Sequence, residues 1–239
     1  MQLNAGGEPV YGPRDVADLE KIRELGLPFW LAGSYGAVGK LAEALSLGAA
    51  GIQVGTAFAF CEESGIRSDI KQQVFQLSRE GKLRVFTDPL ASPTGFPFKV
   101  VQLPGTLSDT KSLPARERLC DLGYLRHAYR KDDGAIGYRC PAEPVEDYIR
   151  KGGTLEETIG RECVCNGLVG TIGLPQVNSE NISGLPLDTA GNEVANVARF
   201  VPPGRDSYTA AEVVRLLLDK VEPATVPPVS AAANEALMK

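Results

Sequence analysis

Two short turns in the first quarter of the sequence carry small residues that suit phosphate binding. Gly33-Ser34 follows one apolar run and Gly55-Thr56 follows another. A glycine turn lets backbone N–H groups approach an anion, and a helix N-terminus behind it adds a favourable dipole, while the two hydroxyls can donate hydrogen bonds. Glycines also follow strands in α/β proteins that bind no phosphate, so the spacing alone leaves both interpretations open.

These turns belong to a predicted strand–helix–strand unit. Residues 29–32 are wholly apolar, which is typical of a strand buried on both faces of a parallel sheet. An apolar stripe at i, i+3, i+4 and i+7 predicts a helix beginning at Val38, and Gly48 suits its left-handed C-cap. Residues 51–54 form the second strand. A right-handed crossover makes two such strands parallel, so both turns should lie at one edge of the sheet.

The same stretch resembles the nitronate monooxygenase family, formerly called 2-nitropropane dioxygenases. The sequence AGSYG, then a helix, then GAAGIQVGTAFAFCEES is similar to the family's AGG turn and its G-x-Q-x-G-T-x-F segment with a nearby E-S pair. In that family these segments are strands seven and eight of a TIM (β/α)8 barrel, and their loops hold the phosphate of flavin mononucleotide (FMN), at the usual phosphate site of such barrels. The resemblance implies these cofactor-binding residues: Ala32, Gly33, Ser34, Gln53, Gly55 and Thr56. Ser34 departs from the family pattern, which has a second glycine there.

The resemblance implies an FMN-dependent oxidoreductase that oxidises alkyl nitronates with O2, so the expected substrate is a small molecule. The long C-terminal segment looks more like related enoyl reductases of lipid or polyketide synthases, and that activity is an alternative. The family's catalytic histidine lies before the AGG turn and is not matched here, so no catalytic residue is assigned. The pattern supplies only the last two strands, which places strands one to six before residue 1. The expected protein partner is a second copy of the chain, in a homo-oligomer, or a missing N-terminal barrel half. A non-catalytic fragment with exposed sheet edges is a further alternative.

Composition excludes several classes of function. The chain has 239 residues, 43% of them hydrophobic, and a net charge of −5. This acidic balance argues against nucleic acid or an anionic membrane surface as a partner. No apolar run is long enough to span a bilayer, and the first residues do not resemble a secretory signal, so we expect a cytoplasmic protein. Five cysteines and no signal favour reduced thiols over a disulfide framework.

The remaining periodic segments predict mainly helices. Apolar spacing predicts a helix after Asp15 that Gly26 closes, and a second helix from Ser68 to Gly81. Shorter signals follow along the chain: strands at 83–86 and 100–103, helices at 144–151, 155–159 and 193–200, a buried glycine-rich connection at 167–174, and a last helix capped by Ser207 or Thr209. In the resembling family, the proline-rich loop at 87–99 returns to the flavin, which makes Ser92, Thr94, Gly95 and Lys99 candidate lining residues. The alternative is a structural loop.

Four cysteines and one histidine complete the inventory of reactive side chains. Four thiolates suffice for tetrahedral zinc, but Cys120, Cys140, Cys163 and Cys165 lack the paired C-x-x-C spacing of a ribbon. We therefore assign no metal ligand at this point, and a zinc-binding interaction module stays an alternative. His127 is expected on the surface, where Arg126 and Arg130 could meet an anion.

The predicted fold class is α/β, namely the C-terminal part of a TIM barrel with its last two strands and helices, followed by an irregular and mostly helical subdomain. The predicted divisions are 1–103 for the FMN-binding barrel part, 104–221 for the α-rich subdomain and 222–239 for a disordered tail.

Overall fold

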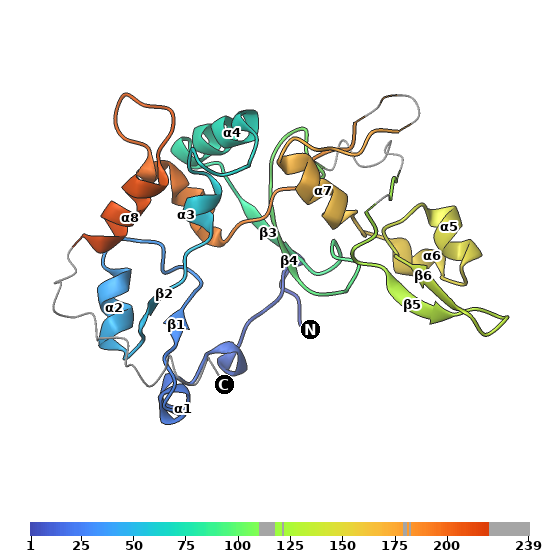
Figure 1. Ribbon diagram of the computed structural model, residues 1–239, viewed down its shortest axis with the longest axis horizontal. Coiled ribbons are helices and arrows are strands. Elements are labelled where there is room, and N and C mark those ends of the chain that lie inside the picture. Colours follow the sequence, from blue (N-terminus) through green and yellow to red (C-terminus); the bar gives the residue numbers. More distant parts are fainter. Residues whose placement is uncertain (110–117, 121, 179–180, 182, 220–239) are drawn as a thin grey trace, which may run out of the picture. The chain divides into compact units, whose positions relative to one another are not determined.

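A computed structural model describes residues 1–109, 118–120, 122–178, 181 and 183–219. The fold is mixed α/β, and its described strands form three small sheets of two strands each, without a closed barrel (Figure 1). Two compact units share the chain. Unit 1 contains Met1–Val10 and Gly65–Ala198, and unit 2 contains Tyr11–Ser64 and the chain from Arg199 onward. The predicted boundary between residues 103 and 104 falls inside unit 1.

Unit 2 is built around the predicted strand–helix–strand segment. Its elements are η1 (Pro13–Asp15), α1 (Leu19–Glu24), β1 (Trp30–Leu31), α2 (Lys40–Ser46), β2 (Gly51–Ile52), α3 (Thr56–Ala59) and α8 (Ala210–Leu218). β1 and β2 are parallel, with Trp30 opposite Gly51 and Leu31 opposite Ile52. The order strand, helix, parallel strand is therefore as the sequence predicts, although both strands are shorter than predicted.

Glycines end the helices of unit 2 where the sequence predicts them to. Gly26 and Gly48, which follow α1 and α2, have φ of 68° and 84°, the left-handed backbone that glycine adopts without a steric cost. The start of α1 differs from the prediction. Asp18, not Asp15, is its N-cap and accepts a hydrogen bond from the backbone N–H of Lys21. Asp15 instead lies in η1, so the short first helix begins about one turn later than expected.

The first strand is not buried on both faces as predicted. Trp30 is 58% exposed, and α1 contributes no buried residue. The physical reason is that the faces of a strand are buried only by layers packed on the sheet, and α1 does not form such a layer over Trp30. The indole still covers part of β2, because a Cβ placed on Gly51 would lie 3.1 Å from Trp30 Cδ1. β1 therefore carries more apolar surface than its contacts in this two-stranded sheet bury.

The C-terminal part of unit 2 holds its N-terminal part in place. Helix α8 packs against α2 and α3 (Figure 1). Tyr208, which precedes α8, is fully buried, and its hydroxyl donates to the Ala57 carbonyl at 2.6 Å. Its own carbonyl accepts from the Glu62 N–H at 2.8 Å. Of the two predicted caps, Thr209 is the N-cap of α8, with Glu212 completing a capping box.

Unit 1 holds the other two sheets. Its elements are α4 (Ser68–Arg79), β3 (Val85–Asp88), β4 (Phe98–Val101), β5 (His127–Arg130), β6 (Ile136–Arg139), α5 (Val145–Arg150), α6 (Leu155–Thr158), α7 (Val164–Thr171) and most of η2 (Asn192–Phe200). β3 and β4 pair antiparallel, with Thr87 opposite Lys99, about two residues away from the predicted strands at 83–86 and 100–103. The helices predicted at 144–151 and 155–159 correspond to α5 and α6. The predicted helix at 193–200 is a 3-10 segment with a kink at Asn196.

The hairpin of β5 and β6 lies in the stretch that the sequence predicts as irregular. His127 pairs with Arg139, and Arg130 pairs with Ile136. Gly134 has φ of 82° in the turn, and Asp133 accepts from the Ala135 N–H at 2.9 Å. An Asp-Gly pair between alternating residues is a hairpin signal, so the sequence carried evidence for this sheet.

Helix α7 occupies much of the stretch at 167–174 that the sequence predicts as a buried connection, and Gly167, Gly170 and Thr171 are buried in it. Gly167 and Gly170 lie where the helix packs against Leu185, Pro186 and Leu187: a Cβ on Gly167 would lie 2.5 Å from Leu187 Cβ. Leu187 N–H donates to the Gly167 carbonyl at 2.9 Å. The glycines here serve close backbone approach, not turn formation. The adjoining core contains Ala91, Val100, Leu107 and Leu187. The predicted tail at 222–239 lies outside the described residues.

Candidate functional site

The parallel strand pair brings the two predicted phosphate turns to one edge. β1 and β2 end in register at Leu31 and Ile52, and Gln53 N–H donates to the Leu31 carbonyl at 2.9 Å. Ala32 and Gln53 therefore leave the sheet side by side. The segments 32–34 and 53–56, which contain all six predicted cofactor-binding residues, follow the same end of the two strands.

The first turn has an unusual backbone. Gly33 and Ser34 both have positive φ, 75° and 68°, and Ser34 is one of two non-glycine residues with positive φ in the described ranges. A side chain in this region costs conformational energy, and such residues concentrate at ligand sites. Consecutive residues of this kind turn their N–H groups out of the regular pattern and can form an anion-binding concavity. The left-handed backbone therefore favours a ligand at Gly33-Ser34.

The space beside both turns is open. Ala32, Gly33, Ser34, Gln53 and Gly55 are exposed, and Thr56, the first residue of α3, is half-buried. A Cβ built on Gly33 or on Gly55 would meet no heavy atom within 4 Å among the described residues. The two glycines differ in backbone, since Gly55 has an ordinary φ of −104°. Glycine is thus conformationally required at position 33 only.

A cation that sequence reasoning missed contacts the first turn. Arg199 Nη2 donates to the Gly36 carbonyl at 2.7 Å, and its guanidinium stacks on the Phe200 ring at 4.8 Å. A Cβ on Gly36 would lie 3.1 Å from Val54 Cγ1, so this turn also approaches the second strand closely. Arginine is the side chain best suited to bind phosphate oxygens. No sequence signal marks it, because 163 positions separate the two partners.

The other predicted lining residues belong to unit 1 and form local structure there. Ser92 Oγ and Thr94 Oγ1 lie 2.8 Å apart, and Gly95 N–H donates to the Ser92 carbonyl in a turn with φ of 74° at Gly95. Lys99 Nζ donates to Asn192 Oδ1 at 2.7 Å. Arg161 Nη1 donates to the carbonyls of Leu90 and Ser92. These contacts fit the structural reading of the loop at 87–99.

A second group of reactive side chains is brought together in unit 1. Cys163 Sγ and Cys165 Sγ lie 4.0 Å apart at the start of α7. The interaction between the Cys120 and Cys163 thiols lowers the pKa of Cys120 and raises the pKa of Cys163. The hydrogen bond with Cys163 likewise lowers the pKa of Cys165. Burial raises the pKa of Cys140, and the charges of Cys120 and Cys165 add to the effect.

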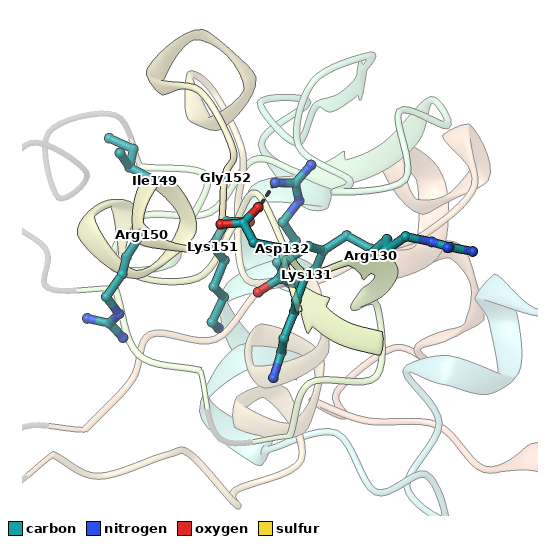
Figure 2. Close-up of a pocket in the computed structure, with 9 residues that line it drawn as sticks. Arg130, Lys131, Asp132, Ile149, Arg150, Lys151 and Gly152 are labelled. Carbon is teal, nitrogen blue, oxygen red and sulfur yellow. Dashed lines mark hydrogen bonds between the residues drawn. The ribbon is translucent and has the colours of Figure 1, made fainter. Parts of the chain in front are cut away.

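A basic cavity in unit 1 is a further feature that the sequence did not reveal. It has a volume of about 570 Å3 and lies between the β5–β6 hairpin and the end of α5 (Figure 2). The side chains of Arg130, Lys131, Arg150 and Lys151 line it, together with Arg139, whose Nη1 donates to the Lys151 carbonyl at 2.8 Å. His127 is exposed on β5 as predicted, and Arg139 Nε contacts its Nε2 at 3.4 Å.

Two findings limit other kinds of site. In the part of the chain that the structure describes, no helix is long and apolar enough to cross a membrane. Among the same residues, no group of three or more His, Cys, Asp or Glu side chains has the arrangement of a ready-made metal site.

We found no family model, no curated protein and no solved structure that matches the chain.

Proposed function

We propose that unit 2 binds the phosphate of FMN and that the protein is a flavin-dependent oxidoreductase of the nitronate monooxygenase type. The observation that carries the proposal is the pair of turns at one edge of β1 and β2, with a left-handed Gly33-Ser34 backbone and Arg199 beside it. Backbone N–H groups, two hydroxyls and a guanidinium in these neighbouring segments are groups that suit a phosphate dianion, and the space beside Gly33 and Gly55 is open.

The same geometry supports a partial TIM barrel as the finer description of the fold. Phosphate sites of such barrels lie at the C-terminal ends of the last two parallel strands, which is where the turns after β1 and β2 lie. The exposed indole of Trp30 supports further cover on this pair, since a barrel strand is buried on both faces. In this proposal the described residues supply two barrel strands and the phosphate-binding corner.

Within the proposed site the chain's own residues position the cofactor. Gly33 and Ser34 would offer N–H donors, Thr56 would offer its hydroxyl, and Arg199 would offset the phosphate charge. Bound FMN would supply the redox chemistry, and the protein would bind and orient it. An alkyl nitronate oxidised with O2 is the proposed substrate.

The first experiment compares FMN with riboflavin on the full chain, because the two differ only in the phosphate. We expect FMN to bind at least about tenfold more tightly, as the loss of one charge-assisted contact costs about 1.5–3 kcal/mol. Inorganic phosphate should weaken FMN binding and leave riboflavin binding unchanged. Equal affinity for both flavins would contradict the phosphate corner.

A matched pair of variants tests the arginine. Arg199→Gln should weaken FMN binding about tenfold while riboflavin binding stays the same. Arg130→Gln, a change of the same type in unit 1, should change neither. Oxygen consumption by the FMN-loaded protein in the presence of an alkyl nitronate would support the nitronate-oxidising activity. Reduction of an enoyl thioester by a nicotinamide donor would instead favour the enoyl reductase alternative.

A further inference from the structure

Three separate chain segments of unit 1, joined to one another by hydrogen bonds, carry four of the five cysteines. Cys120 comes from a loop, Cys140 follows strand β6, and Cys163 and Cys165 lie at the start of α7. The fifth, Cys61, lies in unit 2, where its thiol donates to the Phe58 carbonyl at 3.1 Å. The three segments that carry the other four cysteines are far apart in the sequence but contact one another, which indicates a shared role.

Backbone contacts hold the three segments together next to each thiol. Asn166, beside Cys165, donates through Nδ2 to the Leu119 carbonyl at 3.1 Å, and Leu119 directly precedes Cys120. Arg118 donates through Nη1 to the Pro141 carbonyl at 3.1 Å, and Pro141 directly follows Cys140. The convergence of the thiols therefore follows from hydrogen bonds formed by their neighbours.

The sulfur spacing is close to that of a tetrahedral metal site. Sulfurs about 2.3 Å from a zinc ion at the corners of a tetrahedron are about 3.8 Å from one another. Cys163 Sγ and Cys165 Sγ lie 4.0 Å apart, which is close to this spacing. Because the described residues contain no ready-made group of three ligands, the site requires the Cys120 and Cys140 thiols to move toward this pair when the metal binds.

The surroundings suit a negatively charged metal–thiolate complex. Four thiolates around a divalent ion carry a net charge of −2, so nearby cations are needed. The half-buried guanidinium of Arg118 interacts with Cys140 and Cys163, and the first turn of α7 presents the positive end of a helix to Cys163 and Cys165. The buried carboxylate of Glu143 is paired with Lys151 Nζ at 2.7 Å, so it adds little uncompensated negative charge.

We propose that Cys120, Cys140, Cys163 and Cys165 bind one zinc ion as a tetrahedral tetrathiolate site. Such a site is structural, because all four positions are filled by protein ligands and none is left for a substrate. It would join the loop before residue 121, the end of the β5–β6 hairpin and helix α7. Binding releases the thiol protons, so zinc affinity should rise with pH.

Metal analysis of the full chain, purified without chelator, tests the proposal. We expect about one zinc ion per chain in the unaltered protein and in the control Cys61→Ser. In Cys120→Ser and Cys165→Ser, zinc affinity measured by chelator competition should fall by at least about 100-fold, since losing a ligand costs more than losing an outer-shell partner. Zinc content below about one tenth per chain, or iron in its place, would overturn the assignment.

Two further measurements keep the test decisive if a variant folds poorly. Cobalt added to the metal-free full chain should give the strong visible bands of tetrahedral thiolate coordination, with thiolate-to-cobalt intensity about a quarter lower in Cys140→Ser. Mass spectrometry after alkylation should find all four cysteines protected by zinc and free after chelation. A disulfide among them, seen as a mass lower by about two hydrogens with two cysteines permanently blocked, would contradict the proposal.

Discussion

Two glycine-rich stretches of this protein have similar composition and opposite roles. In the first, around Gly33, the chain is exposed, φ is positive and the space beside the glycine is open. In the second, around Gly167, the residue is helical and buried, and a Cβ would overlap the neighbouring segment. Glycine permits an otherwise costly backbone in one case and close packing in the other. The comparison shows that glycine content predicts a special position but not its physical reason.

The largest effect should come from filling the packed glycine. Gly167→Ala places a methyl group 2.5 Å from Leu187 Cβ and 2.9 Å from Leu107 Cδ1, so either α7 or the 185–187 segment must move. We expect a loss of about 3 kcal/mol in the free energy of unfolding, at the upper end for an overpacked core. Urea denaturation measures this loss. Gly12→Ala, in open space with φ of −134°, is the control and should change stability by less than about 0.5 kcal/mol.

The next effect concerns a buried carboxyl beside the same packed segment. Burial raises the pKa of Asp188 to about 6, and its Oδ2 has no hydrogen-bond partner among the described residues. An unfolded aspartate ionises near pH 3.9, so the folded state loses stability as pH rises from about 4 to about 6. We expect Asp188→Asn to be more stable than the unaltered protein by about 2 kcal/mol at pH 7. The difference should vanish below about pH 4, and a constant difference across this range would contradict the assignment.

A smaller effect is expected at the exposed glycine. Gly33→Ala meets no clash, but it forces a side chain into a left-handed backbone with φ of 75°. The cost should be about 1 kcal/mol, read from the same denaturation curves. Gly55→Ala, equally open but with φ of −104°, should leave stability nearly unchanged. If Gly33→Ala and Gly55→Ala lose the same stability, the positive φ of Gly33 is not the cause of the loss.

The smallest effect has the opposite sign. Ser34 already carries a side chain at φ of 68°, so Ser34→Gly should stabilise the folded chain by about 0.5 kcal/mol after the entropy that glycine adds to the unfolded state. An upward shift of about 1–2 °C in Tm would be the readout. A clear loss of stability would mean that the serine hydroxyl contributes more than its backbone strain costs.

Local signals in the sequence predicted much of unit 2. The apolar runs and the glycines at 26 and 48 gave the order of strands and helices, because periodicity and C-caps depend on near neighbours. The burial of Trp30 was predicted wrongly, since a strand's apolar content does not reveal which elements pack on the faces of the sheet. In unit 1, helix α7 was missed because glycine lowers helix propensity, and only its packing against Leu187 explains glycine there.

The candidate sites also contain a part that the sequence predicts and a part that it does not. The two turns after β1 and β2 could be located from the sequence, because each turn is local to its strand, and their binding of phosphate stays a prediction. Arg199 could not, since its contact with Gly36 depends on the tertiary fold. The gathering of the four cysteines also could not be predicted: it depends on Asn166 and Arg118 contacting carbonyls 47 and 23 positions away. The Asp133-Gly134 pair, by contrast, is a turn signal in the sequence from which the β5–β6 hairpin could have been predicted.

The division of unit 2 between two distant chain segments has a consequence for the order of folding. Tyr208 and Arg199 contact Ala57 and Gly36, so these parts of unit 2 cannot assemble until the ribosome has made at least residue 208. Contacts of such high sequence separation form late, because the loop between them must first be closed. Unit 1, whose residues 65–198 are synthesised in between, can fold first. Until then the apolar strand β1 and the turns after β1 and β2 lack their C-terminal partners.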